Sequence, residues 1–292
     1  MPDETRRRII QAGFLRAGGC QDGGGRILIP ALQRPTPMTL KNRTALVIGG
    51  GAGLGRAIAL AYAKEGAKLA VADLTAATAQ ETLKLAGADG LALALNIAKP
   101  AEIKAGVAAV VQRFGSLDIM VNCAAICLVD PLLEVTPERF DQVFAVNARG
   151  AFFCMTAAAE VMLPKKFGRI ITISTPATRL AVANFATYGA SKAAVDSFTR
   201  SCAVAWAPHG VTVNTIVPGR MTGGMVDALD RDLAKLTGQD LAGLAAARTQ
   251  SLPMQRRVDP AEVASAAVWL ASDAAAYVTA ERFNFTGGME LS

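Results

Sequence analysis

The chain has 292 residues, of which 52% are hydrophobic, 18% charged and 5% aromatic, a composition that is typical of a well-packed globular domain and excludes a disordered chain. The formal net charge is +6, but residues 1–37 carry six arginines and three acids, so the remainder is nearly balanced and has no dense basic patch for nucleic acid. No run of about 18 uncharged apolar residues occurs, so we expect no membrane span.

Residues 1–37 combine an arginine run with glycine- and proline-rich stretches and show little periodicity. This composition predicts a flexible N-terminal extension, followed by a domain that begins at Met38 and runs to residue 292. We recognise no signal peptide in this segment.

From Thr44 onward, short apolar runs typical of buried strands alternate with longer amphipathic stretches typical of helices. Strands are expected at 44–50, 68–74, 90–97, 117–125, 168–175, 211–219 and 282–288. Helices are expected near 54–65, 76–87, 100–114, 137–163, 187–208 and 260–271. This alternation predicts a single doubly wound α/β domain, in which a seven-stranded parallel sheet carries helices on both faces. Residues 220–257 interrupt the rhythm with two short helical patterns, and we expect them to form a small lid over a site.

The stretch GGGAGLG, from Gly49 to Gly55, follows the first expected strand and opens the first expected helix. Glycines in this place allow a tight turn and let the backbone approach a pyrophosphate at the helix N-terminus, so we predict a Rossmann-type nucleotide site. Asp73 ends the second expected strand, where a carboxylate accepts hydrogen bonds from the adenosine ribose and repels a 2′-phosphate. Because Leu74 rather than an arginine follows, we predict NAD rather than NADP; the alternative for Asp73 is an ordinary turn residue.

The five cysteines are an odd number in a long chain, which favours a reduced, cytoplasmic setting. Cys123 and Cys127 form a CxxxC without a second cluster, and the only histidine, His209, lies where a helix is expected to end. We therefore expect neither a metal site of the Cys/His kind nor Ser-His-Asp hydrolysis.

The stretch YGASK places Tyr188 and Lys192 one helical turn apart, a spacing that also occurs in ordinary amphipathic helices. With the other motifs, however, the chain from about Met38 to its end resembles the short-chain dehydrogenase/reductase family. The motifs that carry the resemblance are GxxxGxG at Gly49, Gly53 and Gly55, NCAA at 122–125 for the family's NNAG, Asn147 in VNARG, YxxxK at Tyr188 and Lys192, and Pro218–Gly219.

The resemblance implies hydride transfer between a nicotinamide cofactor and a secondary alcohol or ketone. It implies that Tyr188 is the acid/base, and a nearby Lys192 ammonium is expected to lower the pKa of its phenol from about 10. Lys192 would also donate to the nicotinamide ribose, and Asn147 would hold a water that relays the proton. The family's substrate-orienting serine lies 13 residues before the tyrosine, which here is Thr175, with Ser174 as the alternative.

The resemblance also implies a set of cofactor contacts, in which Asn96 replaces an aspartate and Thr222 stands one place before the usual threonine position, Gly223. These contacts are Gly49, Gly53, Leu54, Gly55, Asp73, Asn96, Ile97, Asn122, Ala124, Tyr188, Lys192, Pro218, Gly219 and Thr222.

The lid and C-terminal sequence are similar to the acetoin/butanediol and sugar-alcohol branch, which implies a polyol or vicinal diol as the small-molecule substrate. The lid residues Met221, Met225, Leu229 and Leu233 fit a more apolar ketone or a cyclic diol equally well.

Two alternative functions remain, an NADPH-dependent keto-reductase in biosynthesis and a non-catalytic NAD-binding redox sensor. Asp73 argues against the first, and the joint presence of Tyr188, Lys192 and Asn147 argues against the second. The family further implies a homotetramer formed through helices within 137–163 and 187–208.

Overall fold

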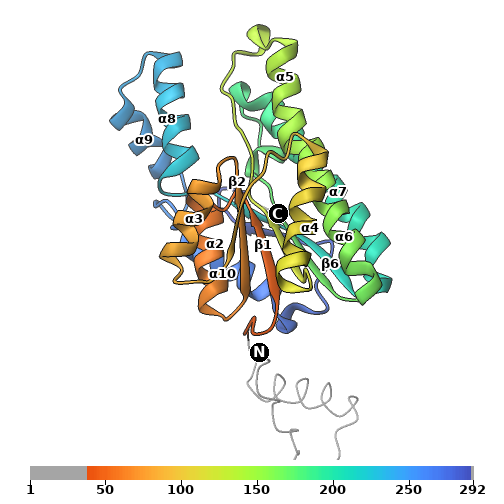
Figure 1. Ribbon diagram of the computed structural model, residues 1–292. Helices are drawn as coiled ribbons and strands as arrows, with labels where there is room; N and C mark the ends of the chain where they lie inside the picture. The colour runs from red at the N-terminus through yellow and green to blue at the C-terminus, as the bar shows by residue number, and fades with distance from the viewer. Residues whose placement is uncertain (1–37, 291–292) are drawn as a thin grey trace, which may run out of the picture. The chain divides into compact units, whose positions relative to one another are not determined.

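The computed structural model describes residues 38–290 (Figure 1), so the predicted N-terminal extension, residues 1–37, lies outside the described residues. All seven predicted strands are present, although each ends one to three residues earlier than expected. Their bounds are β1 Thr44–Ile48, β2 Lys68–Asp73, β3 Leu91–Ala94, β4 Ile119–Asn122, β5 Gly168–Ile173, β6 Val211–Pro218 and β7 Arg282–Phe285. The strands pair in the order β3-β2-β1-β4-β5-β6-β7, and every pair is parallel. The predicted doubly wound α/β fold is therefore confirmed.

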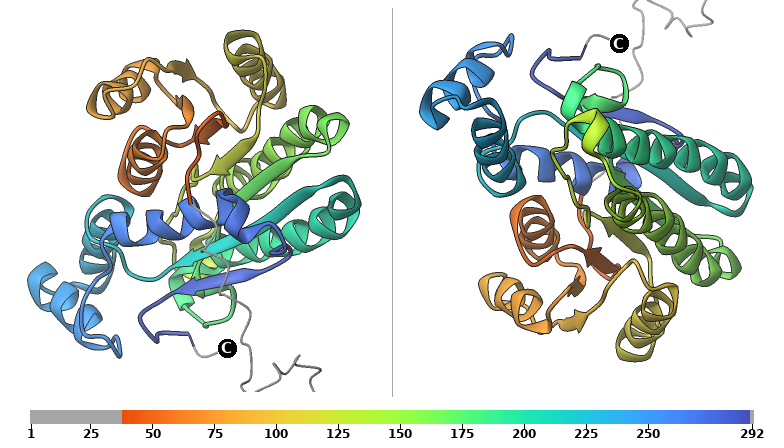
Figure 2. Two further views of the ribbon diagram at one scale, coloured as in Figure 1. Left: turned by 90° about the horizontal axis from the view of Figure 1, so that it is seen from below. Right: turned by 90° about the horizontal axis from the view of Figure 1, so that it is seen from above.

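Two layers of helices cover the sheet, one on each face (Figure 2). Helices α2 (Gly53–Lys64), α3 (Ala76–Leu85) and α10 (Pro260–Ala271) form one layer, and α4 (Pro100–Phe114), α6 (Ala151–Met162) and α7 (Ala186–Trp206) form the other. Successive side chains of β1 alternate between the layers: Ala45 and Val47 pack with the first, and Leu46 and Ile48 with the second. Burial on both faces explains why the central strands β1, β4, β5 and β6 are almost continuously apolar in sequence.

Local sequence signals set the ends of the helices. At the start of α10, Asp259 and Glu262 form a capping box, and Pro260 occupies the first helical position, where no intrahelical N–H is needed. At the end of α4, Gly115 adopts a left-handed conformation with φ of 80° and terminates the helix.

The stretch 137–163 is not the single helix that its sequence predicted. It divides into α5 (Pro137–Phe144), a π-helical turn at Ala145–Gly150, and α6. Asn147 lies in the π-helical turn, where its side chain bonds to both backbone polar groups of Ile126. A side chain of Gly150 would also come within 2.7 Å of the Ile97 carbonyl oxygen, so the chain passes close to the loop after β3. Periodicity does not reveal such a turn, although π-helical turns are frequent at functional sites.

The order of the strands places a crevice at the carboxyl ends of β1 and β4, which are neighbours in the sheet but not in the chain. Ligands of open α/β sheets bind at such a switch point. The two helical patterns of the predicted lid, residues 220–257, are α8 (Gly224–Thr237) and α9 (Leu241–Gln250), which extend beyond the body of the sheet at the top left of Figure 1. Their role as a lid stays a prediction. Among the helices of residues 38–290, none is long and apolar enough to cross a membrane.

Candidate active site

A cavity of about 470 Å³ opens at this crevice, between the glycine loop, the ends of β4 and β5, the start of α7 and the lid. Most of the residues that the sequence predicted to bind cofactor or substrate line it. These are Gly49, Gly53, Leu54, Gly55, Asp73, Asn96, Ile97, Ala124, Thr175, Tyr188, Lys192, Pro218, Gly219 and Thr222. Segments from the whole length of the domain therefore converge on one site.

The glycine loop is packed too closely for other residues at two positions. Gly49 has φ of 72°, and a Cβ atom there would lie 2.6 Å from the backbone nitrogen of Ala124. A Cβ atom on Gly55 would lie 2.0 Å from the carbonyl oxygen of Gly49. The loop therefore folds tightly onto the first turn of α2, whose free N–H groups face an incoming pyrophosphate. This geometry fits the phosphates of a dinucleotide.

Asp73 is fixed beside the glycine loop by two backbone groups. Its Oδ2 accepts a hydrogen bond from the Gly51 N–H at 2.8 Å, and its Oδ1 accepts one from Leu74 at 2.7 Å. The nearby cation, Arg56, donates to the Gly51 carbonyl oxygen and is paired with Glu81 at 2.8 Å. The carboxylate thus lines the cavity beside the glycine loop, and its role in selecting NAD over NADP stays a prediction.

The first turns of α7 place Tyr188 and Lys192 in the same cavity. The Lys192 Nζ donates a hydrogen bond to the Ile173 carbonyl oxygen at 2.7 Å, and burial lowers the pKa of Lys192 to about 8. Burial raises the pKa of Tyr188, although the neighbouring Thr175 side chain lowers it in part. In the protein alone, burial has the larger effect on the pKa of Tyr188, so the lowering of this pKa by Lys192 stays a prediction. An ionised Tyr188 needs further positive charge, which the nicotinamide ring of NAD⁺ would supply when bound.

Thr175 and Ser174 both line the cavity. The Thr175 Oγ1 accepts a hydrogen bond from Ala177 at 3.3 Å, which holds the hydroxyl in the turn that follows β5. Ser174 is 3% exposed, and within residues 38–290 its Oγ has no hydrogen-bond partner. Strand alternation predicted that Ser174 would face away from the site, but β5 ends at Ile173, so alternation no longer governs the next two residues. Both hydroxyls belong to residues that line the cavity, and the spacing from Tyr188 in the sequence favours Thr175 as the group that binds the substrate oxygen.

Two predicted site residues lie behind the cavity wall rather than on it. Asn122 is 4% exposed, and its Oδ1 accepts a hydrogen bond from Ala124 at 3.2 Å. Asn147 is fully buried and donates to Ser191, on α7, at 3.1 Å in addition to its bonds with Ile126. Their side chains therefore hold the cavity wall and α7 in place, and the predicted role of Asn147 in a proton relay remains a prediction.

The substrate half of the cavity is mainly apolar, and the sequence motifs predicted few of its residues. The aliphatic, aromatic and sulfur-bearing side chains that line it are Ile126, Cys127, Leu180, Val182, Phe185, Met221, Met225, Val226, Leu229 and Met289. Asp73, at the cofactor end, is the only carboxylate among the described lining residues. Leu233, also expected among the lid residues, lies on α8 but is buried and does not line the cavity. Hydrophobic periodicity predicts only that such residues belong to the core or the lid, so the sequence contains no signal for a role in substrate binding.

Two cysteines, Cys123 and Cys127, line the cavity. Burial raises the pKa of both Cys123 and Cys127 to about 12, so each remains a thiol at neutral pH. No group of three His, Cys, Asp or Glu side chains is placed to hold a metal ion in residues 38–290.

Comparison with known proteins agrees with this geometry. A family model described as enoyl-(acyl carrier protein) reductase matches residues 49–290. Galactitol 2-dehydrogenase of Agrobacterium fabrum (strain C58 / ATCC 33970) is 37% identical over 256 residues, covering 87% of this chain and 100% of the relative. The 3-oxoacyl-(acyl-carrier-protein) reductase of Vibrio cholerae serotype O1 is 36% identical over 254 residues, with coverages of 87% and 100%. The solved structure of NAD⁺-bound xylitol dehydrogenase is 28% identical with a TM-score of 0.82, covering 85% of this chain and 99% of that one.

The glycine loop at the switch point and the Tyr188–Lys192 pair line the same cavity. Together they define the class of the protein, a nicotinamide-dependent oxidoreductase that acts on alcohol groups. The chain belongs to the short-chain dehydrogenase/reductase family. Its similarity to a sugar-alcohol dehydrogenase agrees with the resemblance seen in its sequence.

Proposed function

We propose that the protein is an NAD-dependent dehydrogenase that interconverts a small secondary alcohol and the corresponding ketone. The observation that carries the proposal is the convergence of Tyr188, Lys192 and Thr175 on the cavity that also holds the glycine loop and Asp73. The relative solved with NAD⁺ and named xylitol dehydrogenase supports both the cofactor and the reaction.

In the proposed mechanism, the Thr175 hydroxyl holds the substrate oxygen next to the Tyr188 phenol. During oxidation, Tyr188 removes the hydroxyl proton, and during reduction it returns one. Lys192, anchored on the Ile173 carbonyl oxygen, presents its ammonium beside the site and favours the ionised phenol. NAD⁺, when bound, would accept the hydride from the carbinol carbon.

Of the two substrate classes expected from the resemblance, we propose a vicinal diol with a mainly apolar skeleton rather than an extended polyol. Each hydroxyl of a polyol that enters an apolar wall without a partner costs about 1–3 kcal/mol. The lining residues Met225, Leu229 and Phe185 offer no such partner, whereas Ser174, Thr175 and Thr222 offer a few hydroxyls. Arg220 and Arg248 also line the cavity, but they are already paired with Ser251 and Asp230. The relative named galactitol 2-dehydrogenase supports the extended-polyol alternative.

A second candidate is reduction of a keto-acyl compound with NADPH, which the relative named 3-oxoacyl-(acyl-carrier-protein) reductase favours. The two candidates differ at Asp73, whose carboxylate would repel the 2′-phosphate of NADPH. Preference for NAD(H) over NADP(H) would therefore reject the second candidate.

A single panel tests both candidates. We would measure kcat/KM for cis-1,2-cyclohexanediol, 2,3-butanediol, galactitol and sorbitol with NAD⁺ and NADP⁺ in parallel, and for the reverse reactions with a diketone and an acetoacetyl thioester. We expect the diols to exceed the polyols and NAD⁺ to exceed NADP⁺. Failure of every alcohol and ketone, together with intact NADH binding, would instead favour a redox sensor.

We also propose that the protein works in the cytoplasm as a homotetramer. A groove of about 820 Å³ runs between α5, α6 and α7 and is lined by Phe144, Phe152 and Phe198 together with several charged residues. Next to it, Phe140 is 42% exposed, which is unusual for a large aromatic side chain. These helices are the ones through which the family resemblance predicted assembly.

A further inference from the structure

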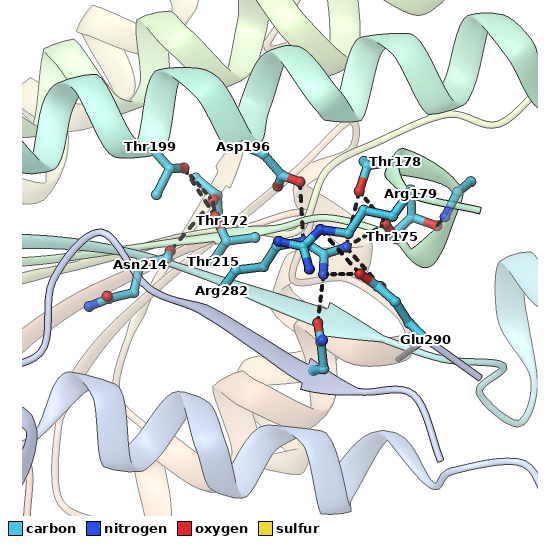
Figure 3. Close-up of polar contacts among 12 residues, drawn as sticks. Thr172, Thr175, Thr178, Arg179, Asp196, Thr199, Asn214, Thr215, Arg282 and Glu290 are labelled. Carbon is cyan, nitrogen blue, oxygen red and sulfur yellow. Dashed lines mark hydrogen bonds and ion pairs between the residues drawn. The ribbon is translucent and has the colours of Figure 1, made fainter. Parts of the chain in front are cut away.

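The first residue of β7, Arg282, lies at the centre of a buried polar network beside the candidate active site. Figure 3 shows its guanidinium between Asp196 of α7 and Glu290 of the C-terminal segment, with Thr175 and Thr178 next to it. The side chains of Arg282, Asp196 and Glu290 are 12%, 9% and 1% exposed. Charges buried to this extent require partners, and the partners here come from four different parts of the chain.

Every nitrogen of the guanidinium is used. Its Nε donates to the Asp196 Oδ2 at 3.3 Å, and its Nη1 donates to the Asn284 Oδ1 at 2.7 Å and the Glu290 Oε1 at 2.5 Å. Its Nη2 donates to the Glu290 Oε2 at 3.0 Å. The two parallel bonds with Glu290 form a bidentate pair, which fixes the plane and the direction of the guanidinium.

The same Nη2 reaches the loop that carries the substrate-orienting hydroxyl. It donates to the Thr175 carbonyl oxygen at 3.2 Å and to the Thr178 Oγ1 at 3.0 Å. The Thr178 hydroxyl and backbone N–H in turn donate to the same Thr175 carbonyl oxygen at 3.0 and 3.3 Å, so three donors meet on one backbone oxygen. The position of Thr175 therefore depends directly on Arg282.

The network also joins this loop to the other parts of the site. Asp196 lies one helical turn after Lys192 on α7, so the guanidinium links the Thr175 loop to the helix that carries Tyr188. Glu290 follows Met289, which lines the cavity, and Arg179 of the Thr175 loop approaches Glu290 from the solvent side at 3.4 Å. Two cations thus face two carboxylates, and the network is balanced in charge.

We propose that Arg282 and Glu290 are positioning residues, which hold Thr175 at its working distance from Tyr188 and join the C-terminal segment to the catalytic loop. This proposal rests on the proposed dehydrogenase function for its kinetic effect but not for its structural effect. Neither residue contacts the cavity, so neither takes part in proton or hydride transfer. Arg282→Lys would keep the positive charge but remove the planar guanidinium, whose N–H groups donate to Glu290 and Thr175 at the same time.

The test compares Arg282→Lys with a matched control, Arg256→Lys. Arg256 forms the same kind of bidentate pair, with Glu262 at 2.6 and 2.7 Å, but this pair is about half exposed and lies outside the cavity lining. Because a small displacement of a positioning group costs up to about a hundredfold in rate, we expect Arg282→Lys to lower kcat roughly ten- to a hundredfold. We expect the dissociation constant for NADH to change less than about twofold. The control should leave both values unchanged.

A double-mutant cycle with Thr175→Val shows whether Arg282 acts through Thr175. If it does, Arg282→Lys should cost less than about threefold in kcat once the Thr175 hydroxyl is absent. Thr178→Val removes one hydrogen bond from the network without altering its charge. It should also lower kcat, and this loss should likewise become smaller in the Thr175→Val background. An equal loss from Arg282→Lys in both backgrounds, or an unchanged kcat in Thr178→Val, would overturn the proposal.

A crystal structure of Arg282→Lys supplies a readout that does not depend on activity. We expect residues 174–179 to shift by about 0.5 Å or more while the sheet and the glycine loop superpose on the wild-type protein, since positioning sites require tolerances of this order. An unmoved Thr175 would overturn the inference even if the protein proved to be a redox sensor. Absence of turnover in the wild-type protein would instead count against the proposed function alone.

Discussion

The Lys192 ammonium donates a 2.7 Å hydrogen bond to the carbonyl oxygen of Ile173, the last residue of β5. This bond ties α7 to the strand end from which Ser174 and Thr175 continue. It fixes the ammonium in a buried position, where desolvation lowers its pKa to about 8 while Asp196 opposes that change. The charge of Lys192 is therefore lost at a much lower pH than that of an exposed lysine, which titrates near 10.4.

The first prediction is that ketone reduction declines as the pH rises through about 8. Reduction needs a protonated Tyr188, whose pKa is raised by burial, and a charged Lys192. Because Tyr188 stays protonated over this range, the decline reports the loss of the Lys192 proton. The measurement is kcat/KM for the ketone at saturating NADH between about pH 6 and pH 10. Lys192→Arg keeps its charge, so any activity it retains should not show this decline. A decline only near 10.4 in the wild-type protein would mean that burial does not lower the pKa of Lys192.

The second prediction concerns the hydroxyl groups of the site. Tyr188→Phe removes one oxygen and should lower turnover about 10²–10⁴-fold, because the acid/base is lost. NADH binding and the melting temperature should remain at wild-type values, since the substitution keeps the aromatic ring that lines the cavity and removes only its oxygen. Turnover near the wild-type value in Tyr188→Phe would remove the proposed mechanism.

A matched series separates the roles of Thr175 and Ser174. Thr175→Val keeps the shape and removes the hydroxyl, so it should lower kcat, whereas Thr175→Ser should retain activity. Ser174→Ala should have a mild effect, because its Oγ makes no hydrogen bond within residues 38–290. The reverse pattern, an impaired Ser174→Ala and an active Thr175→Val, would assign the substrate oxygen to Ser174.

The fold was more predictable from the sequence than the details of the site. Apolar runs and glycine turns identified every strand of residues 38–290, because the central strands are buried on both faces. The π-helical turn around Asn147 was missed because the apolar period continues through it. Ser174 was misplaced because alternation was extended beyond the last strand residue, Ile173. Arg282 carried no motif, since its importance comes from partners that are distant in sequence and meet only in the folded chain.

The third prediction is that residues 1–37 are dispensable. The start of the domain is already fixed by its own contacts: Leu40 is fully buried, and its N–H donates to the Glu65 carbonyl oxygen at 2.9 Å. A chain that begins at Met38 should therefore match the full-length protein in melting temperature and turnover. A drop of more than about 4 °C, which corresponds to at least roughly 1 kcal/mol, would indicate that the extension contributes to stability.

The fourth prediction concerns assembly through α5, α6 and α7. Val204 is 75% exposed on α7, so Val204→Glu should not disturb the core but should place a charge in the proposed interface. We expect light scattering after size exclusion to give four chains for the wild-type protein and fewer for Val204→Glu. Leu85→Glu is the control, because Leu85 is 58% exposed at the end of α3, outside the proposed interface. A tetramer that survives Val204→Glu would exclude this part of α7 from the interface.

The fifth prediction is that Asp73 and Leu74 set the choice of cofactor. Asp73→Asn keeps an acceptor for the Gly51 N–H but removes the charge, so it should lower the NAD⁺/NADP⁺ ratio of kcat/KM through electrostatics alone. Leu74 is 70% exposed and lines the cavity, so an arginine there would have room to meet a 2′-phosphate. Hydrogen bonds to charged groups are worth about 1.5–3 kcal/mol, so Leu74→Arg in the Asp73→Asn background should raise kcat/KM for NADP⁺ by a further ten- to roughly a hundredfold. Leu74→Arg alone should raise kcat/KM for NADP⁺ by a smaller factor, because the Asp73 carboxylate would pair with the new guanidinium. Equal use of NAD⁺ and NADP⁺ by the wild-type protein would show that the Asp73 carboxylate does not discriminate, and would favour the keto-reductase candidate.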